Sequence, residues 1–104
     1  MTDINQLVNE IKLSTDFQLN KKILREKIQT DLHMAQSGGL FKITPELIAF
    51  VETWPTDEIY LEDVYQNPIL IDRQNFLVTA RQHYQQVMNR WHNEYEQIRK
   101  IRKV

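Results

Sequence analysis

The sequence predicts an α+β fold, mostly helical, in a single domain that spans residues 1–104. Three observations favour it. Long segments at both ends contain no glycine or proline, apolar residues in those segments recur at helical spacing, and short β-branched runs lie in the middle third among the prolines. We therefore expect two N-terminal helices, a small β-hairpin element with a short helix, and a long C-terminal helix. A chain of this length is enough for one hydrophobic core.

The N-terminal segment predicts helices at about 3–13 and about 15–36, which are either separate or joined as one kinked rod. The apolar face changes at residues 14–16, and Thr15 followed by Gln18 matches a capping box. The glycine pair at 38–39 is expected to end the second helix, because glycine readily adopts the left-handed conformation found there. The apolar positions are Ile4, Leu7, Val8 and Ile11 in the first helix, and Phe17, Leu24, Ile28 and Leu32 in the second.

The middle of the chain predicts a β element with one short helix. Residues 40–43 are a strand candidate. Thr44 and Pro45 provide an N-cap and a proline at the first helical position, so a short helix is expected to follow and to end near Trp54. Residues 58–64 and 69–71 are β-branched and aromatic runs with a turn between them, which is typical of a small hairpin.

The C-terminal segment predicts one long helix, which Asp72 can cap and which contains no glycine or proline through Val104. A helix of about 31 residues would be about 46 Å long, whereas a compact domain of about 100 residues has a radius of gyration near 13 Å. We therefore expect this helix to extend past its own core or to be covered by the N-terminal helices or another chain. The predicted partner-binding residues on its apolar stripe are Tyr84, Val87, Met88, Trp91, Tyr95 and Ile98.

Charge is balanced overall but uneven along the chain. Because the formal net charge is −1, we do not expect the molecule as a whole to attract nucleic acid electrostatically. An acidic surface is predicted at Asp57, Glu58, Glu62 and Asp63, which is either a solvated hairpin, a docking surface or a set of ligands for a divalent cation. A basic tip is predicted at Arg99, Lys100, Arg102 and Lys103, where the cations contact phosphates or complement the helix dipole.

Several kinds of chemistry find no support in the sequence. The chain has no cysteine, which excludes disulfides, thiolate nucleophiles and cysteine-based metal sites and suits a reducing cytoplasm. The first residues do not have the pattern of a secretory signal, and no apolar run is long enough for a membrane span. His33, His83 and His92 lack the spacing of a metal site. We therefore expect no metal, no cofactor, no small-molecule substrate and no enzymatic activity.

Three runs in the second part of the chain carry a resemblance. They are Gly-Gly-Leu-Phe-Lys-Ile-Thr-Pro-Glu-Leu-Ile-Ala-Phe from residue 38, Leu-Glu-Asp-Val-Tyr-Gln-Asn-Pro-Ile from residue 61, and Gln-His-Tyr-Gln-Gln-Val-Met-Asn-Arg-Trp-His from residue 82. Residues 38–103 thereby resemble small uncharacterised proteins of T4-like tailed phages, including cyanophages. The resemblance implies a role in virion assembly or in binding another phage or host protein, in the host cytoplasm or the virion, and it transfers no functional residue.

Three functions remain open at this level. The leading one is a non-catalytic protein–protein interaction protein, a phage structural or assembly component that forms a homo-oligomer or docks on a protein partner through its long helices. The alternative is a nucleic-acid-linked accessory or regulatory protein that uses the basic tip. The third is an enzyme that uses a metal held by the Asp57–Asp63 carboxylates. The apolar stripe is longer than one small core needs, and this favours the first.

Overall fold

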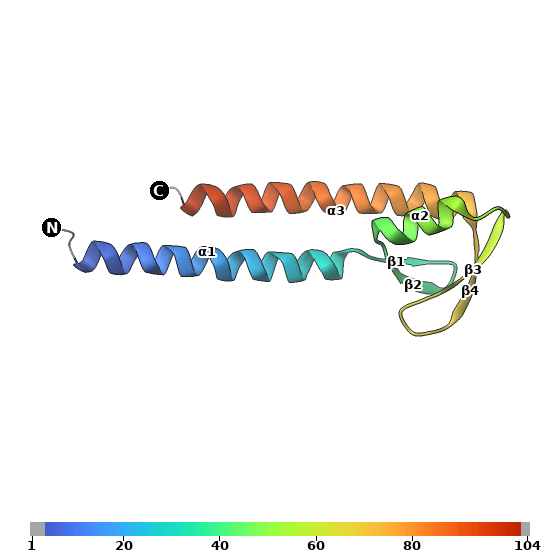
Figure 1. Ribbon diagram of the computed structural model, residues 1–104, viewed down its shortest axis with the longest axis horizontal. Coiled ribbons are helices and arrows are strands. Elements are labelled where there is room, and N and C mark those ends of the chain that lie inside the picture. Colours follow the sequence, from blue (N-terminus) through green and yellow to red (C-terminus); the bar gives the residue numbers. More distant parts are fainter. Residues whose placement is uncertain (1–3, 103–104) are drawn as a thin grey trace.

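The computed structural model describes residues 4–102, and their side chains through residue 100. The elements are α1 (Ile4–Asp31), β1 (His33–Gln36), β2 (Gly39–Lys42), α2 (Pro45–Thr53), β3 (Glu58–Glu62), β4 (Pro68–Asp72) and α3 (Arg73–Arg102). Helices α1 and α3 lie side by side in opposite directions and form a stalk, while the other elements gather at one end as a head (Figure 1). The fold is therefore α+β and mostly helical, with three helices.

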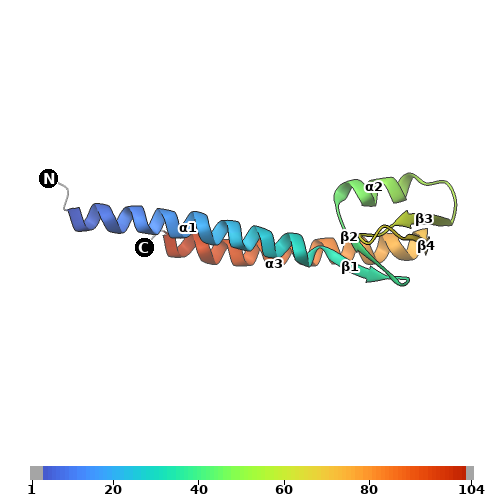
Figure 2. The same ribbon diagram turned by 90° about the horizontal axis from the view of Figure 1, so that it is seen from below.

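The molecule is strongly elongated. Its principal extents are 69 × 22 × 19 Å and its radius of gyration is 19.9 Å, compared with about 13 Å for a compact domain of about 100 residues. Turning the view by 90° leaves the stalk equally long, with α2 and the hairpins still confined to one end (Figure 2). The C-terminal helix extends beyond the head and is covered there by the N-terminal helix, which is one of the arrangements expected for it. The head surrounds only the first turns of α3.

The N-terminal prediction of two helices, at about 3–13 and 15–36, is wrong. Residues 4–31 form one continuous helix, and the capping-box match at Thr15 marks no helix start. Backbone hydrogen bonding does not depend on which face is apolar, so a change of face need not interrupt a helix. The apolar face changes at residues 14–16 near the place where α3 ceases to cover α1 (Figure 1).

The residues before the glycine pair form a strand rather than the end of a helix. β1 pairs with β2 in antiparallel register, with Met34 opposite Phe41. Ser37 and Gly38 both have positive φ, 55° and 84°, as a two-residue hairpin turn of the primed type requires. The glycine pair therefore belongs to a hairpin turn, and Gly39 also lies where a Cβ atom would approach Ile69 Cγ1 to 2.8 Å.

The other elements of the head follow the sequence prediction. The Thr44 side chain accepts a hydrogen bond from the Leu47 backbone N–H at 3.1 Å, and Pro45 opens α2. β3 and β4 form the expected hairpin, in which Tyr60 lies opposite Leu70. The head core includes Phe41 and Phe76, whose rings meet edge to face with centroids 5.4 Å apart.

The stalk has a second core between α1 and α3. Its fully covered members are Leu24, Ile28, Leu32 and Val87. Two polar contacts also join the helices: Lys27 Nζ lies 3.0 Å from Glu94 Oε1, and His83 Nε2 lies 2.7 Å from the Asp31 carbonyl oxygen. Because a carbonyl oxygen only accepts, His83 Nε2 carries the proton and satisfies one carbonyl at the C-terminus of α1.

Asp63 organises the turn between β3 and β4. Its carboxylate accepts hydrogen bonds from three backbone N–H groups, those of Leu40 (3.3 Å), Tyr65 (3.0 Å) and Asn67 (2.9 Å). The Asn67 bond is the largest cause of a lowered pKa of the Asp63 carboxyl, because hydrogen bonds to the ionised form stabilise it. Asp63 is buried and joins the second hairpin to β2.

The stalk core predicts unequal effects for two isoleucines of α1. Ile28 is completely buried against α3, whereas Ile23 is 54% exposed. We expect Ile28→Ala to lower the free energy of unfolding by about 2–5 kcal/mol, since it opens a cavity, and the matched control Ile23→Ala to change it by under about 1 kcal/mol. Urea unfolding followed by circular dichroism measures both. Equal effects would mean that α1 does not pack on α3 in this register.

Asp63 predicts a pH-dependent stability difference. Asp63→Asn places an amide N–H against the Leu40 N–H and loses the ionic acceptor, so the melting temperature should fall at pH 7. Because the folded-state pKa of Asp63 is lowered, its contribution is present above the unfolded pKa and disappears as pH falls through the folded pKa. The difference between wild type and variant should therefore narrow below about pH 4. The exposed neighbour provides the control, since Glu62→Gln should change little at either pH.

Candidate interaction surfaces

The apolar stripe predicted on the C-terminal helix is covered by α1 of the same chain. Val87 is completely buried in the stalk core and cannot contact a partner in the folded protein. The five other predicted partner-binding residues are half-buried and pack against the same core: Tyr84, Met88, Trp91, Tyr95 and Ile98. The prediction that this stripe as a whole forms a docking face is therefore corrected, because an intramolecular helix already occupies most of it.

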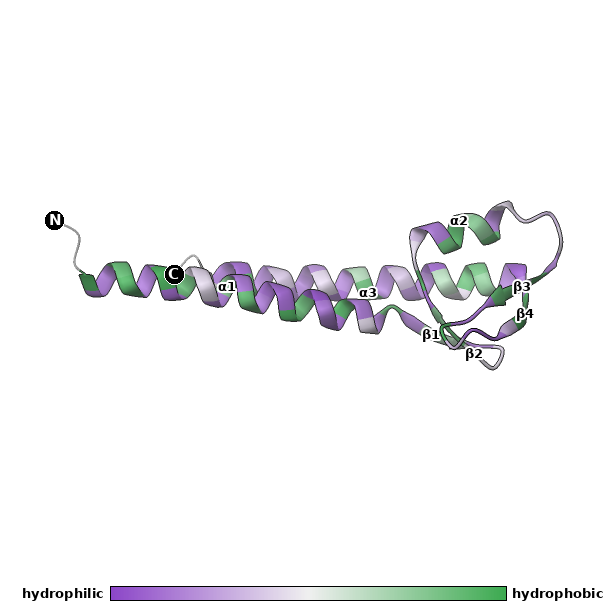
Figure 3. Ribbon diagram, turned by 60° about the horizontal axis from the view of Figure 1, so that its bottom comes forward, coloured by the Kyte–Doolittle hydropathy of each residue, from purple (hydrophilic) through white to green (hydrophobic). Residues whose placement is uncertain are grey.

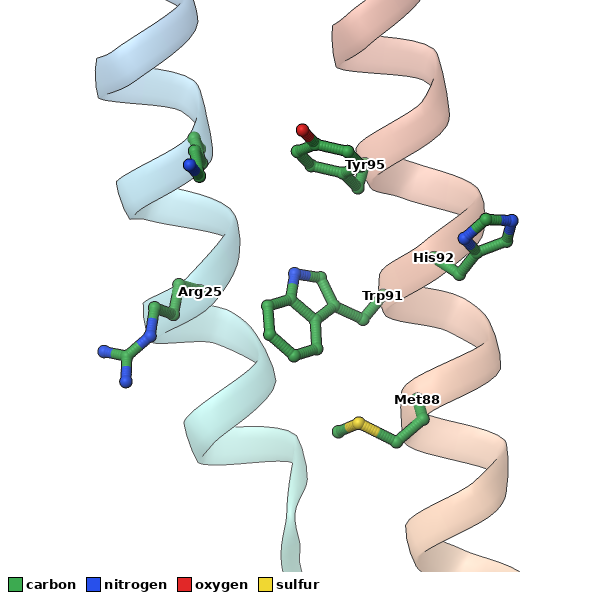
Figure 4. A pocket seen from close by; sticks show the side chains of 6 residues that line it. Arg25, Met88, Trp91, His92 and Tyr95 are labelled. Carbon is green, nitrogen blue, oxygen red and sulfur yellow. The ribbon is translucent and has the colours of Figure 1, made fainter.

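Part of the stripe remains accessible in a groove along one side of the stalk. The cavity measures about 300 Å³ and is lined by Lys21, Arg25, Met88, Trp91, His92 and Tyr95. Met88, Trp91 and Tyr95 extend from α3 toward α1, and Arg25 lies opposite Trp91 (Figure 4). Lys21 and Arg25 are one helical turn apart and form no ion pair with any residue that the structure describes. The groove therefore combines an apolar floor with a cationic rim.

The N-terminal part of α1 carries apolar side chains that no described part of the chain covers. Every residue from 4 to 16 is exposed, and α1 continues past the C-terminal end of α3 (Figure 1). Apolar bands recur along this part of the helix (Figure 3). We call the residues at i, i+3, i+4 and i+7 the ridge: Ile4, Leu7, Val8 and Ile11, which are 76%, 47%, 55% and 58% exposed.

The head presents a surface that is both aromatic and acidic. Glu58, Tyr60 and Glu62 point outward from β3, and Leu70 lies across from Tyr60 on β4. Beside them a cavity of about 500 Å³ is lined by residues that include Phe50, Trp54, Tyr60 and Leu70. The Phe50 and Trp54 rings are 5.7 Å apart, and both are exposed. We call Glu58, Tyr60, Glu62 and Leu70 the acidic face.

The four carboxylates predicted as one acidic surface do not act together. Asp57, Glu58 and Glu62 are exposed, but Asp63 is buried and engaged by backbone N–H groups, so including it in the surface was wrong. Among residues 4–100 no group of three or more histidine or carboxylate side chains is placed to hold a metal ion.

The basic tip is partly neutralised. Arg99 donates hydrogen bonds to both carboxylate oxygens of Glu96, the shortest at 2.7 Å, and this guanidinium lowers the pKa of the Glu96 carboxyl. Lys100 is exposed. The side chain of Arg102 and all of Lys103 lie outside the described part of the chain. Of the four residues predicted to contact phosphate, only Arg99 and Lys100 have side chains that the structure describes. Of these two, Lys100 alone has no ion pair within the described part of the chain.

Two features of these surfaces were not predicted from the sequence. Lys21 and Arg25 meet Trp91 only because α1 and α3 are antiparallel, and no local pattern indicates this. Phe50 lies on α2, Trp54 directly after it, and Tyr60 and Leu70 on β3 and β4. Their one sequence signal was the outward alternation of residues 58–62, which indicates one solvent-facing side of a strand.

Neither helix of the stalk, nor α2, contains a stretch within residues 4–102 that is long and apolar enough to cross a membrane. In comparisons with known proteins, no protein-family model, no curated protein and no solved structure matched the chain.

Proposed function

We propose that this chain is a non-catalytic interaction protein that self-associates through its long helices. The observation that carries the proposal is the ridge on α1. Four large apolar side chains at helical spacing lie beyond the reach of α3, where no described residue covers them. Isolated exposed apolar residues are ordinary, but a contiguous row of them marks an interaction site in a soluble protein.

A second copy of the same segment suits the ridge. The spacing at 4, 7, 8 and 11 is symmetric about its midpoint, so an antiparallel copy would bring Ile4 opposite Ile11 and Leu7 opposite Val8. This is the self-complementary arrangement that a two-fold contact requires. The stalk supports the same geometry, because α1 already packs in antiparallel fashion on α3. Electrostatic repulsion between two copies of this segment should be small, because Glu10 and Lys12 are the only charged residues between positions 4 and 15.

We propose further that the protein is a structural or assembly component of a phage virion. This part of the proposal rests on the resemblance of residues 38–103 to small phage proteins. A nucleic-acid-linked role through the basic tip has less support, since Arg99 is already paired with Glu96. A metal-dependent enzyme has less still, since Asp63 is engaged by the backbone of its own turn.

The ridge predicts that Leu7→Glu combined with Ile11→Glu prevents self-association. Burying each side chain stabilises a contact by about 1.5–3 kcal/mol, and each 1.4 kcal/mol is a factor of ten in Kd. We therefore expect Kd to rise about a hundredfold or more. Size-exclusion chromatography with light scattering, over low to high micromolar protein, measures this. Helix content should be unchanged, because both residues are exposed and glutamate is a good helix former.

A matched control adds the same charge to the other side of the helix. Gln6→Glu with Asn9→Glu should associate as the wild type does, since these positions lie away from the ridge. A wild type that stays monomeric at high micromolar concentration, or a control that dissociates as completely as the ridge variant, would contradict the proposal.

A further inference from the structure

We propose that the groove on the stalk binds the acidic face on the head of a second copy of this chain, which produces head-to-stalk assembly. The inference rests on the proposed function of self-association. It concerns a different surface from the ridge, and it assigns an occupant to each of two surfaces that the fold leaves uncovered.

The groove has the character of a site for an acidic and aromatic surface. Its floor is made by Met88, Trp91 and Tyr95, and its rim by Lys21, Arg25 and His92, with no carboxylate among the lining residues. Like charges at i and i+4 of a helix are slightly destabilising on their own. An anionic partner would remove that cost for Lys21 and Arg25, which lack ion pairs within the described chain.

The acidic face has the complementary character. Glu58 and Glu62 flank Tyr60, which is 68% exposed, and Leu70 lies beside it on the neighbouring strand. Neither β3 nor β4 contains a lysine or arginine. An exposed tyrosine between two carboxylates can insert its ring against Trp91 and Met88 while the carboxylates reach the cations of the rim. Tyrosine, tryptophan and arginine are the residues that most often carry binding energy at interfaces.

The two surfaces cannot meet within one molecule. The head packs on the first turns of α3, through Phe76, Leu77 and Ala80, and the groove is formed by residues 88–95 of the same unbroken helix. From Phe76 to Trp91 the helix rises about 22 Å. A rigid helix thus holds the head away from the groove, and the complement must come from another copy. A contact between two different surfaces is heterologous, so it propagates into rings or filaments rather than stopping at a dimer.

Charge reversal on each surface tests the inference. The head variant is Glu58→Lys with Glu62→Lys, and the groove variant is Lys21→Glu with Arg25→Glu. Each variant alone should lose the higher assemblies of the wild type, with at least about a tenfold rise in Kd. An equimolar mixture should regain them, because the head of the groove variant fits the groove of the head variant and the reversed pair again has opposite charges. Light scattering and sedimentation velocity measure the sizes.

Controls separate folding and bulk charge from the contact. All variants should melt cooperatively near the wild type, because the four residues are exposed. Lys22→Glu with Lys42→Glu makes the same change in net charge off the groove, and it should assemble as the wild type does. Raising the salt concentration should weaken assembly of the wild type and of the mixture, since exposed charge pairs are screened.

These experiments distinguish failure of the head-to-stalk contact from failure of the proposed self-association. Assembly that survives both double variants but is lost in the ridge variant overturns the head-to-stalk contact and leaves the proposed function intact. A mixture that fails to regain assembly also overturns it. A strictly monomeric wild type overturns both proposals. If such a monomer binds a single-stranded oligonucleotide and the groove variant does not, the groove serves nucleic acid instead.

Discussion

The antiparallel contact between α1 and α3 is the constraint on which the rest of the molecule depends. A 28-residue helix and a 30-residue helix bury a narrow apolar row between them, with Leu24, Ile28 and Val87 inside it. In proteins most of the stability of a helix comes from the packing of its apolar face, so this contact stabilises both helices. The buried row sets the axial position of one helix on the other, and the contacts of Lys27 with Glu94 and of His83 with the Asp31 carbonyl agree with it. That position decides where the two helices cease to overlap.

The surfaces follow from this register. Because α1 reaches past the end of α3, the apolar residues of its N-terminal part have no partner among the residues that the structure describes (Figure 1). Because the two helices are cylinders in contact, a groove remains along their side, and Trp91 and Tyr95 are too large to be covered completely by α1. The head stays at the far end, since the first turns of α3 form its core with β2, β3 and β4. One helix pair therefore sets the separation between the acidic face and the cationic groove.

Sequence reasoning predicted the elements whose signals are local. Thr44 and Pro45 specify the start of α2, Asp72 caps α3 through the Asn75 N–H, and the β-branched and aromatic run at 58–64 predicted the strand that forms at Glu58–Glu62. It failed where the deciding interaction is between residues distant in sequence. β1 is only four residues long, and it forms because its residues pair with β2, with Met34 opposite Phe41. This pairing partner is not visible in the local pattern of residues 32–36, which fits a helix equally well. The glycine pair fits a helix end and a hairpin turn alike.

The candidate site divides in the same way. The stripe on α3 was recognisable from its period, but the period does not say whether the covering helix belongs to the same chain. Here it does, and the uncovered row of helical apolar residues lies instead on the N-terminal part of α1, whose changed face at residues 14–16 was the available clue. The placement of Lys21, Arg25 and Trp91 around one groove depends on the helix register and has no signature in the sequence.

Hydrogen exchange measured by mass spectrometry at several protein concentrations tests the central claim most directly. The account predicts that amides of residues 17–31 are protected at every concentration, because α3 covers that part of α1, and that amides of residues 4–13 exchange fast in dilute protein and become protected as concentration rises. Equal protection of both segments in dilute protein, or fast exchange at 4–13 that does not change with concentration, would contradict it.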